Sequence, residues 1–337
     1  MMKYCVRRRK PEMSDRREIS RVVFEACLKV RPGEKVLILT DRNKEHLARP
    51  LYDLGKTITD TVLQIIPVTR FDGDEPGREV TELCQRFDVI LAPTTMSVSH
   101  TSAMVEARRK GARVATMPGI TDEIFDTALL TDYRALSEKT VRLQRQMNSA
   151  RELYVTAPGG TDVRFSVEGR EFFALDGCCH APGAFVNLPD GEVMVAPVEE
   201  SINGCLAFDL SLMPDHLTDF GIIGLLTKEK VIVEVESGRI KSIKGGGKAG
   251  VFRDVLAAAD ERASVVAEFA MGTNPAAVII GNILMDEKVD GTVHFAFGSN
   301  VSFGGKNQSN VHLDGVISRP SVMADGVWII KNGKLSR

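Results

Sequence analysis

The segment Pro32–Asp41 reads PGEKVLILTD, and its central residues Val36–Leu39 form an uninterrupted apolar run. Pro32–Gly33 is a typical turn pair, and Thr40–Asp41 can cap a following helix. A short apolar run between such signals predicts a strand that is buried on both faces. Strands of this kind occur mainly in parallel sheets that helices cover.

The same combination recurs along the first half of the chain. A helix is expected over residues 16–30, and helical patterns separate the later strands. Strands that alternate with helices predict a Rossmann-like α/β domain with a parallel sheet. Because no GxGxxG pattern follows the first strand, we expect no NAD in this domain. The later strands are expected at Val62–Ile66, Val89–Ala92 and Arg113–Met117.

The character of the sequence changes near residue 150. Residues 133–152 contain no Gly or Pro and predict one long helix. Beyond it, strand patterns separated by Gly turns predict an α+β half, with one helix expected over residues 251–263. A chain of 337 residues is long enough for two domains. We therefore expect an α/β domain over residues 1–150 and an α+β domain over residues 151–337.

The composition is that of an ordinary globular protein. Charged residues make up 26%, hydrophobic residues make up 43%, and the formal net charge is -2, which argues against nucleic acid as a partner. No apolar run approaches the ~20 residues that span a bilayer. The basic run Arg7–Lys10 is followed by Pro11 and not by the apolar stretch of a secretory signal. Six cysteines without CxxC spacing fit reduced thiols, so we expect a cytoplasmic protein without a membrane partner.

Three short stretches between residues 264 and 315 carry side chains that can bind a metal ion. They are VVAEFAMGTNP with Glu268, GTVHFAFG with His294, and NVHLDGV with His312 and Asp314. Successive side chains on a strand alternate between its faces, so His312 and Asp314 point to one side and can hold the same cation. By the same alternation, His294 faces away from its apolar neighbours.

Each of these side chains also has an ordinary structural explanation. A lone strand histidine such as His294 is more often a hydrogen-bonded residue than a ligand. Glu268 is the stronger clue, because a carboxylate among apolar neighbours is costly to bury unless it pairs with Arg or Lys or binds a metal. Glu192, in NLPDGEVMVAP, is either an exposed turn residue or a further oxygen ligand. Two imidazoles and three carboxylates would suit one or two divalent ions such as Zn, Co or Mn, which activate water for hydrolysis.

The stretches NLPDGEV, AEFAMGTNP, GTVHFAFG and VHLDG, in this order over Asn187–Gly315, resemble the aminopeptidase T, or leucyl aminopeptidase, type of thermophilic metallopeptidase. The resemblance implies an α/β N-terminal domain, a homodimer and a dinuclear site in which Glu192 and Glu268 also serve catalysis. The sequence differs from this family in two places. It has Gly191 where the family usually has a second glutamate, and it has no tyrosine after Tyr154. The implied metal ligands are Glu192, Glu268, His294, His312 and Asp314.

The chain also resembles the mononuclear iron 2,5-dihydroxypyridine dioxygenases, which share the His-x-Asp motif and a preceding Gly-Gly, here Gly304–Gly305. Those enzymes complete a two-His, one-carboxylate triad with a histidine where this chain has Glu268. The resemblance implies acid–base chemistry for His100, which follows the strand ending at Ala92, where ligand clefts of parallel sheets form. The alternative is that His100 only begins the following helix.

Four further polar residues are candidates for substrate binding. Each also lies beside a turn signal that explains it equally well. These residues are Asn203, Asn274, Asn282 and Ser309.

We expect first a metal-dependent hydrolase of the aminopeptidase type, in which metal-activated water attacks an amide of a short peptide or small molecule while a carboxylate moves the proton. The alternative is a non-haem iron ring-cleaving dioxygenase of dihydroxylated N-heterocycles, with His294, His312 and Asp314 as its triad. A third hypothesis, prompted by the missing tyrosine, is a binding or scaffold protein without activity. The sequence leaves the substrate, the native metal and the number of ions open.

Overall fold

The computed structural model describes residues 13–336, with side chains described from Arg16 onward, so Arg7–Lys10 lies outside the described residues. Contacts divide the described residues into two units. The first contains the residues up to Leu130 together with Cys178–Leu188, and the second contains Thr131–Gly177 and the residues from Pro189 onward.

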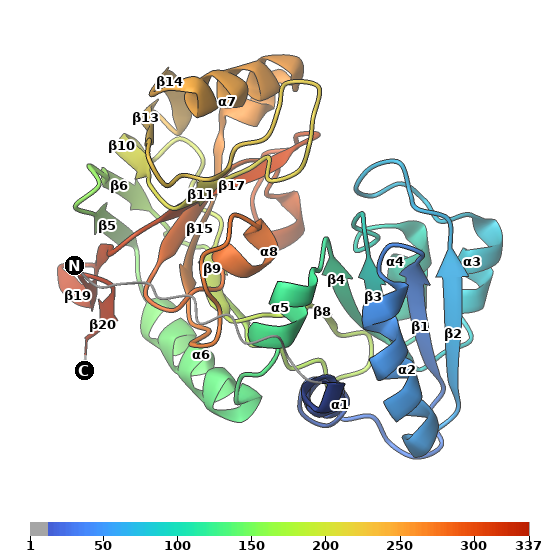
Figure 1. Cartoon of the computed structure of the whole chain (residues 1–337). Helices are drawn as coiled ribbons and strands as arrows, with labels where there is room; N and C mark the ends of the chain where they lie inside the picture. Colours follow the sequence, from blue (N-terminus) through green and yellow to red (C-terminus); the bar gives the residue numbers. More distant parts are fainter. Residues whose placement is uncertain (1–12, 337) are drawn as a thin grey trace. The chain divides into compact units, whose positions relative to one another are not determined.

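The first unit is built around five parallel strands, β1 (Val36–Asp41), β2 (Thr61–Ile66), β3 (Val89–Thr94), β4 (Arg113–Pro118) and β8 (Phe185–Asn187). Their order in the sheet is β2–β1–β3–β4–β8 (Figure 1). Strand β1 lies between β2 and β3, and all six of its residues are buried. Burial on both faces explains the apolar run in its sequence, and the predicted parallel α/β sheet is confirmed.

The helices of the first unit follow the strands in alternation. The helix expected over residues 16–30 is present as α1 followed by a π-helical turn, after which the chain enters the loop before β1. The helical segments are α1 (Met13–Arg21), the π-helical turn Val22–Cys27, α2 (Glu45–Ile58), α3 (Arg78–Cys84), α4 (Ser102–Arg109) and α5 (Asp122–Thr127).

The second unit contains two sheets. The seven-stranded sheet has the order β12–β11–β17–β16–β15–β9–β7. Its strands are β7 (Phe173–Leu175), β9 (Glu192–Val195), β11 (Ser211–Leu212), β12 (Gly224–Leu225), β15 (Val266–Gly272), β16 (Val293–Gly298) and β17 (His312–Ile317).

The eight-stranded sheet has the order β14–β13–β10–β6–β5–β18–β19–β20. Its strands are β5 (Glu152–Thr156), β6 (Asp162–Ser166), β10 (Asn203–Phe208), β13 (Val231–Glu236), β14 (Arg239–Lys244), β18 (Ser321–Ala324), β19 (Val327–Lys331) and β20 (Lys334–Leu335). The helices of this unit are α6 (Tyr133–Met147), α7 (Gly247–Ala258) and α8 (Ile283–Asp286).

The core of the second unit lies between the facing sides of these two sheets. Phe165 of β6 packs edge-on against Phe269 of β15, with ring centroids 5.3 Å apart, and against Phe295 of β16 at 5.8 Å. Phe208 of β10 meets Phe297 of β16 at 6.1 Å. Aromatic side chains from β15 and β16 therefore fill one side of the seven-stranded sheet, and the alternate residues of the same strands face its other side.

The contact-based division differs from the boundary expected near residue 150. Helix α6 groups with the second unit, and the segment that contains β8 returns to the first unit to extend its sheet beside β4. Part of the glycine patch Lys244–Gly250 is helical, because α7 begins at Gly247, before the start expected at residue 251.

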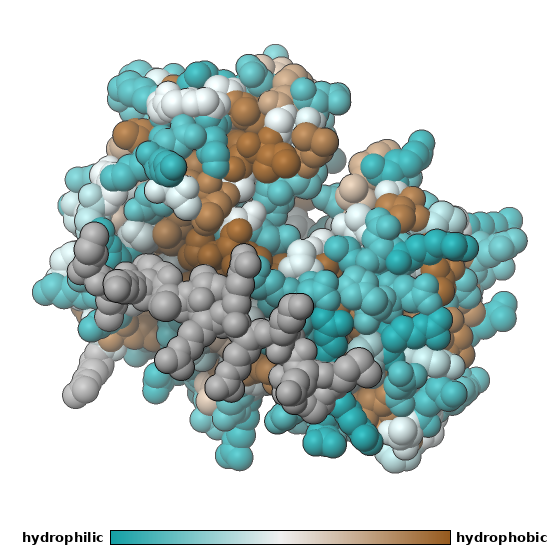
Figure 2. Space-filling model, in the orientation of Figure 1, coloured by the Kyte–Doolittle hydropathy of each residue, from teal (hydrophilic) through white to brown (hydrophobic). Residues whose placement is uncertain are grey.

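Hydrophilic residues cover much of the face seen in Figure 2. The loop between β11 and β12 exposes three large apolar side chains, Leu217, Phe220 and Ile222. Among residues 13–336, none of the helices has the length and apolar character that crossing a membrane requires.

Candidate metal centre

Four adjacent strands of the seven-stranded sheet bring the predicted ligands together. Glu192 begins β9, Glu268 lies in β15, His294 lies in β16, and both His312 and Asp314 lie in β17. These side chains belong to the face opposite the aromatic core, as the alternation in their sequences predicts. The sheet therefore joins residues that are more than a hundred positions apart in the sequence.

Small residues stand between the predicted ligands. Ala296 of β16 pairs with Glu268 on one side and with Asp314 on the other, and Ala270 of β15 pairs with His294. Neighbouring strands lie ~4.8 Å apart, so the two carboxylates start roughly 10 Å apart across the alanine. A methyl group at this position leaves space into which both carboxylates and the imidazole can turn.

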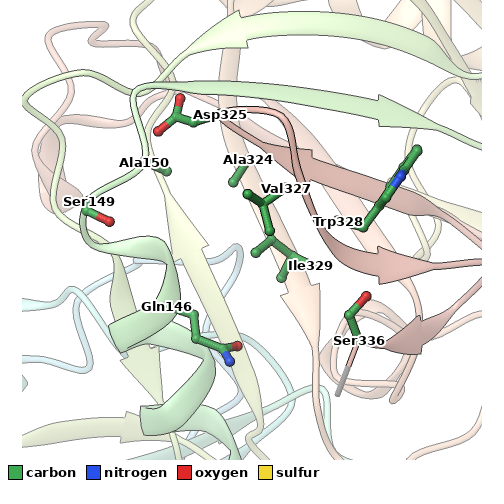
Figure 3. Close-up of a pocket in the computed structure, with 9 residues that line it drawn as sticks. All are labelled: Gln146, Ser149, Ala150, Ala324, Asp325, Val327, Trp328, Ile329 and Ser336. Atoms are coloured by element: carbon green, nitrogen blue, oxygen red, sulfur yellow. The ribbon is translucent and has the colours of Figure 1, made fainter.

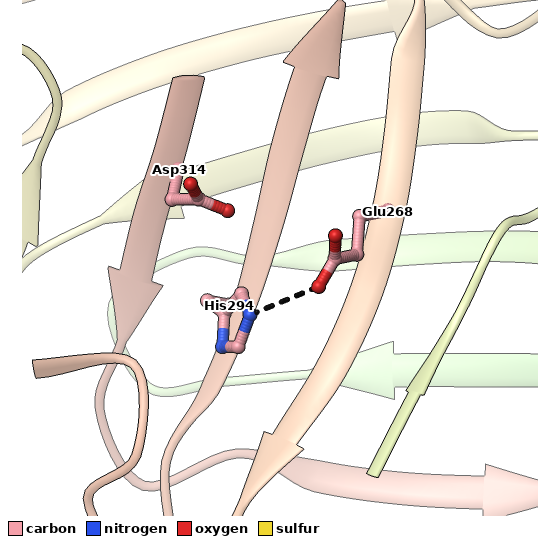
Figure 4. Close-up of side chains that lie close together, drawn as sticks. All are labelled: Glu268, His294 and Asp314. Atoms are coloured by element: carbon pink, nitrogen blue, oxygen red, sulfur yellow. Dashed lines mark hydrogen bonds and ion pairs between the residues drawn. The ribbon is translucent and has the colours of Figure 1, made fainter. Parts of the chain in front are cut away.

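The side chains use this space to converge. His294 Nε2 lies 3.3 Å from Glu268 Oε1, while His312 Nε2 lies 3.2 Å from Glu268 Oε2 and 3.4 Å from Asp314 Oδ1. One ligand atom each from Glu268, His294 and Asp314 falls within 4.8 Å of the others, and all three residues are buried (Figure 4). This spacing allows the three atoms to bind one ion.

The ring of His312 is oriented by a backbone contact. Its Nδ1–H donates to the carbonyl oxygen of Ser299 at 2.9 Å, which directs Nε2, the atom that carries the lone pair in the neutral ring, toward Glu268 and Asp314. We assign this tautomer from the contacts, because a carbonyl oxygen can only accept. A hydrogen bond on the far nitrogen is the usual arrangement of a metal-binding histidine.

Burial and charge set the protonation of the cluster when no metal is bound. Burial acts to raise the pKa of Glu268, but hydrogen bonds from His294 and His312 outweigh it and hold this pKa well below its usual range. Burial acts to lower the pKa of His294, yet Glu268 and Glu192 raise it to about 9. The carboxylates therefore favour positive charge at this position, from protons on the imidazoles or from a metal ion.

Glu192 stands at the edge of the cluster. Burial raises the pKa of Glu192 to about 8, although the ammonium of Lys288 opposes this shift from 2.6 Å. Its other oxygen, Oε2, lies 3.4 Å from His294 Nε2 and accepts no hydrogen bond from the described residues. The Nδ1 atom of His294 is likewise buried without a hydrogen-bond partner among them.

These observations fit a divalent metal ion. The cluster contains two imidazoles and two carboxylates, which is the donor set that Fe, Mn, Co and Zn accept. Glu192 Oε2 and His294 Nδ1 are buried polar atoms whose hydrogen-bonding capacity is unused, and such atoms are uncommon outside functional sites. The described residues thus include a site suited to a divalent metal.

The remaining candidates have local partners. Asn203 accepts from the Ser237 N–H at 2.9 Å, and Asn274 donates to the Asp190 carbonyl at 2.8 Å. Asn282 caps α8 by accepting from the Leu284 N–H, and Ser309 donates to Asp260. These contacts are those of turn and capping residues, which is the alternative explanation of the four side chains. That they bind substrate stays a prediction.

His100 lies in the first unit, outside the residues that form the cluster. It is exposed in the turn before α4, and its ring contacts that of Phe185 with centroids 6.1 Å apart. Its role in acid–base chemistry stays a prediction.

Lys288 is the residue of this region that the sequence did not single out. It follows Asp286 and Glu287 in a run of charged residues that reads as an exposed turn, yet its side chain is only 2% exposed. The sequence carries no local signal of this burial, because its acidic partners Asp190 and Glu192 lie almost a hundred positions away.

A separate pocket of about 370 Å³ lies in the second unit (Figure 3). None of the cluster residues lines it, and its one carboxylate, Asp325, already accepts from the backbone N–H groups of Arg151 and Glu152. Its lining residues are Gln146, Ser149, Ala150, Ala324, Asp325, Val327, Trp328, Ile329 and Ser336.

Comparison with solved structures identifies two similar folds. The 2,5-dihydroxypyridine dioxygenase of Pseudomonas putida KT2440 superimposes with a TM-score of 0.79 at 17% identity, covering 97% of this chain and 98% of that one. AmpT from Thermus thermophilus superimposes with a TM-score of 0.69 at 16% identity, covering 96% and 99%. At these identities the similarity shows a shared two-unit α/β fold.

Sequence comparison separates the two relatives. A curated 2,5-dihydroxypyridine 5,6-dioxygenase from Pseudomonas putida is 24% identical over 258 residues, which cover 72% of this chain and 70% of the relative. This match favours the dioxygenase, which was the alternative hypothesis, over the hydrolase that was expected first from the sequence motifs. The family model NicX, described as 2,5-dihydroxypyridine 5,6-dioxygenase, matches residues 16–337, and the chain therefore belongs to this enzyme family.

Proposed function

We propose that this protein is a non-haem iron dioxygenase that opens the ring of a dihydroxylated N-heterocycle. The observation that carries the proposal is the family match over residues 16–337, together with a cluster of two histidines and two carboxylates within the matched region. Iron with two histidines and one carboxylate is the usual centre of non-haem oxygenases, because three protein ligands leave coordination positions open.

The cluster residues take distinct parts in this proposal. His294, His312 and Asp314 form the triad, with His312 fixed by its hydrogen bond to the Ser299 carbonyl. Glu268, which contacts both imidazoles, supplies a further oxygen ligand where the resembling dioxygenases have a histidine. When bound, iron supplies the redox chemistry that joins O₂ to an organic ring.

The surroundings suit a substrate with acidic hydroxyl groups. Glu192, a carboxylate beside the cluster that this proposal does not use as a ligand, can accept a proton from a ring hydroxyl as the substrate binds. In ring cleavage by a dioxygenase, both atoms of O₂ enter the organic product, so no external reductant is consumed. The chain needs to supply only binding, orientation and proton transfer.

The proposal is tested with protein loaded with Fe(II) under anaerobic conditions. Oxygen uptake is then recorded after addition of 2,5-dihydroxypyridine or related dihydroxylated N-heterocycles, and ring opening is followed by loss of the aromatic absorbance. We expect one O₂ consumed per ring opened, and no uptake by Asp314→Asn. Protein that contains a full equivalent of iron but consumes no oxygen with any of these compounds would refute the proposal.

A hydrolase is the second candidate, and one observation favours it. Glu192 and Glu268 add two buried carboxylates to the triad, which is more acidic oxygen than a two-His, one-carboxylate centre requires. The matching experiment is release of amino acids from short peptides and aminoacyl amides by protein loaded with Zn, Co or Mn. Turnover there without oxygen uptake with iron would favour the hydrolase.

A further inference from the structure

Lys288 holds a buried ammonium group beside the metal cluster. Its Nζ lies 2.6 Å from Glu192 Oε1, 2.8 Å from Glu287 Oε1 and 3.7 Å from Asp190 Oδ1. The Lys288 side chain is 2% exposed, and those of Asp190 and Glu192 are 2% and 4% exposed. A charge buried this deeply is stable only when opposite charges and hydrogen bonds compensate it.

Glu192 joins this ion pair to the metal cluster. One of its oxygens, Oε1, contacts the ammonium of Lys288, while the other, Oε2, lies 3.4 Å from Nε2 of the predicted ligand His294. A carboxylate that faces a cation on each of its oxygens has the geometry of a bridge. Here one side of that bridge is already occupied by an ammonium group.

The charges on the two sides of Glu192 are consistent with this arrangement. On one side, the three acidic side chains Asp190, Glu192 and Glu287 all face the single ammonium of Lys288. On the other, Glu268 and Asp314 contact the two histidines and make no contact with Lys288 among the ion pairs of the described residues. Glu268 and Asp314 together balance one divalent ion, while the other three carboxylates already have the ammonium of Lys288 between them.

We propose that the ammonium of Lys288 takes the position beside Glu192 that a second divalent ion would occupy in a dinuclear centre, so that this protein binds one ion. Lys288 is thereby a positioning residue, which fixes Glu192 and determines the number of metals. The inference rests on the metal centre of the proposed function, but it concerns the number of ions and not the reaction.

The wild-type protein provides the first test. Metal-free protein is titrated with Mn(II), and bound metal is measured by mass spectrometry of the metal after removal of free ions. We expect saturation at one equivalent per chain and the electron paramagnetic resonance spectrum of isolated Mn(II). Saturation at two equivalents, or the spectrum of a spin-coupled pair, would overturn the proposal.

Variants of Lys288 provide the second test. Lys288→Ala removes the ammonium and leaves Asp190, Glu192 and Glu287 around the vacated space, so we expect a second equivalent of Mn(II) and a spin-coupled spectrum. Lys288→Met, which fills most of the space with an apolar chain, should stay at one equivalent. A folded Lys288→Ala protein that saturates at one equivalent contradicts the inference.

Lys139→Ala is the matched control. Lys139 belongs to the same unit and pairs with Asp290 at 2.5 Å, but it has no contact with Glu192 among the ion pairs of the described residues. It should bind one equivalent, like the wild type. If Lys288→Ala does not fold, Lys288→Ser is titrated in its place, and its saturation at one equivalent would overturn the inference. Absence of oxygen uptake would count against the proposed reaction and leave these metal counts valid.

Discussion

Arg170 and Glu199 form a partly buried ion pair that holds the loop between β16 and β17. Arg170 donates from Nη1 to the carbonyl oxygen of Gly304 at 2.6 Å. Glu199 accepts from the backbone N–H of Lys306 at 2.6 Å and from the side chain of Asn300 at 3.3 Å. The loop thus depends on one carboxylate for several of its contacts.

The same loop begins at Ser299, whose carbonyl oxygen orients His312. Glu199→Gln keeps the size of the side chain but removes its charge, so the loop should loosen and the imidazole of His312 should lose its fixed direction. We expect metal affinity to fall by about 10-fold, the lower end of what the loss of an orienting contact costs. Isothermal titration with Mn(II) measures this, and Glu236→Gln, an exposed residue paired with Lys241, is the control.

Glu199 also makes the stability of this loop depend on pH. Burial acts to raise its pKa, but the N–H of Lys306 and the charge of Arg170 outweigh burial and lower it. A carboxyl group whose folded pKa is lowered stabilises the protein above its unfolded pKa, and this contribution is lost as pH falls. Glu199→Gln should therefore cost about 1 kcal/mol at pH 7 and progressively less below pH ~4.5. Urea unfolding at both pH values checks this, and a cost that does not depend on pH would contradict it.

Replacing Glu268 should remove metal binding, because this carboxylate contacts both imidazoles. In Glu268→Gln we expect metal affinity to fall by more than roughly 100-fold, beyond the range for residues that only orient ligands. Glu268→His is the informative companion, since the resembling dioxygenases have a histidine at this position. It should retain iron, and metal analysis of both variants after purification from iron-supplemented cells compares them. Equal iron content in the wild type and Glu268→Gln would show that Glu268 is not a metal ligand.

The space between the carboxylates can be closed without touching a ligand. Ala296 pairs with both Glu268 and Asp314, so Ala296→Val places two additional methyl groups where these side chains converge. We expect metal binding to be lost while the protein stays folded, at a cost of about 1–3 kcal/mol for overpacking. Ala207→Val, at a buried position of the other sheet, is the control for overpacking alone. Metal affinity that falls equally in both variants would mean that the space does not matter.

The sequence predicted the elements whose signals are local. Strand β1 has an apolar run because both of its faces are buried, and β16 alternates because one face carries His294 while the other carries Phe295 and Phe297. These patterns follow from the environment of each strand, so they can be read without knowing its neighbours. Five side chains chosen by such patterns do lie on four adjacent strands.

What the sequence did not predict depends on contacts between distant segments. Strand β8 has three residues and joins the first unit only by pairing with β4, for which no local signal exists. Lys288 reads as a surface residue within a charged run, and its burial follows from three acidic partners of which Asp190 and Glu192 lie almost a hundred positions away. The motifs around the cluster resemble both the hydrolases and the dioxygenases, and only the match over residues 16–337 distinguishes the two families.

Replacement of His100 tests catalysis separately from metal binding. It belongs to the first unit and is exposed, so its replacement should not disturb the cluster in the second. If His100 transfers a proton during the reaction, His100→Gln should bind a full equivalent of iron and unfold at the same denaturant concentration as the wild type. Its kcat should fall by about 100-fold or more, which is typical for loss of a general acid or base. The pH profile of kcat should also lose one of its limbs. Oxygen-uptake kinetics between pH 5 and 9 measure both effects, and a variant with unchanged kcat and an unchanged profile would show that His100 only begins its helix.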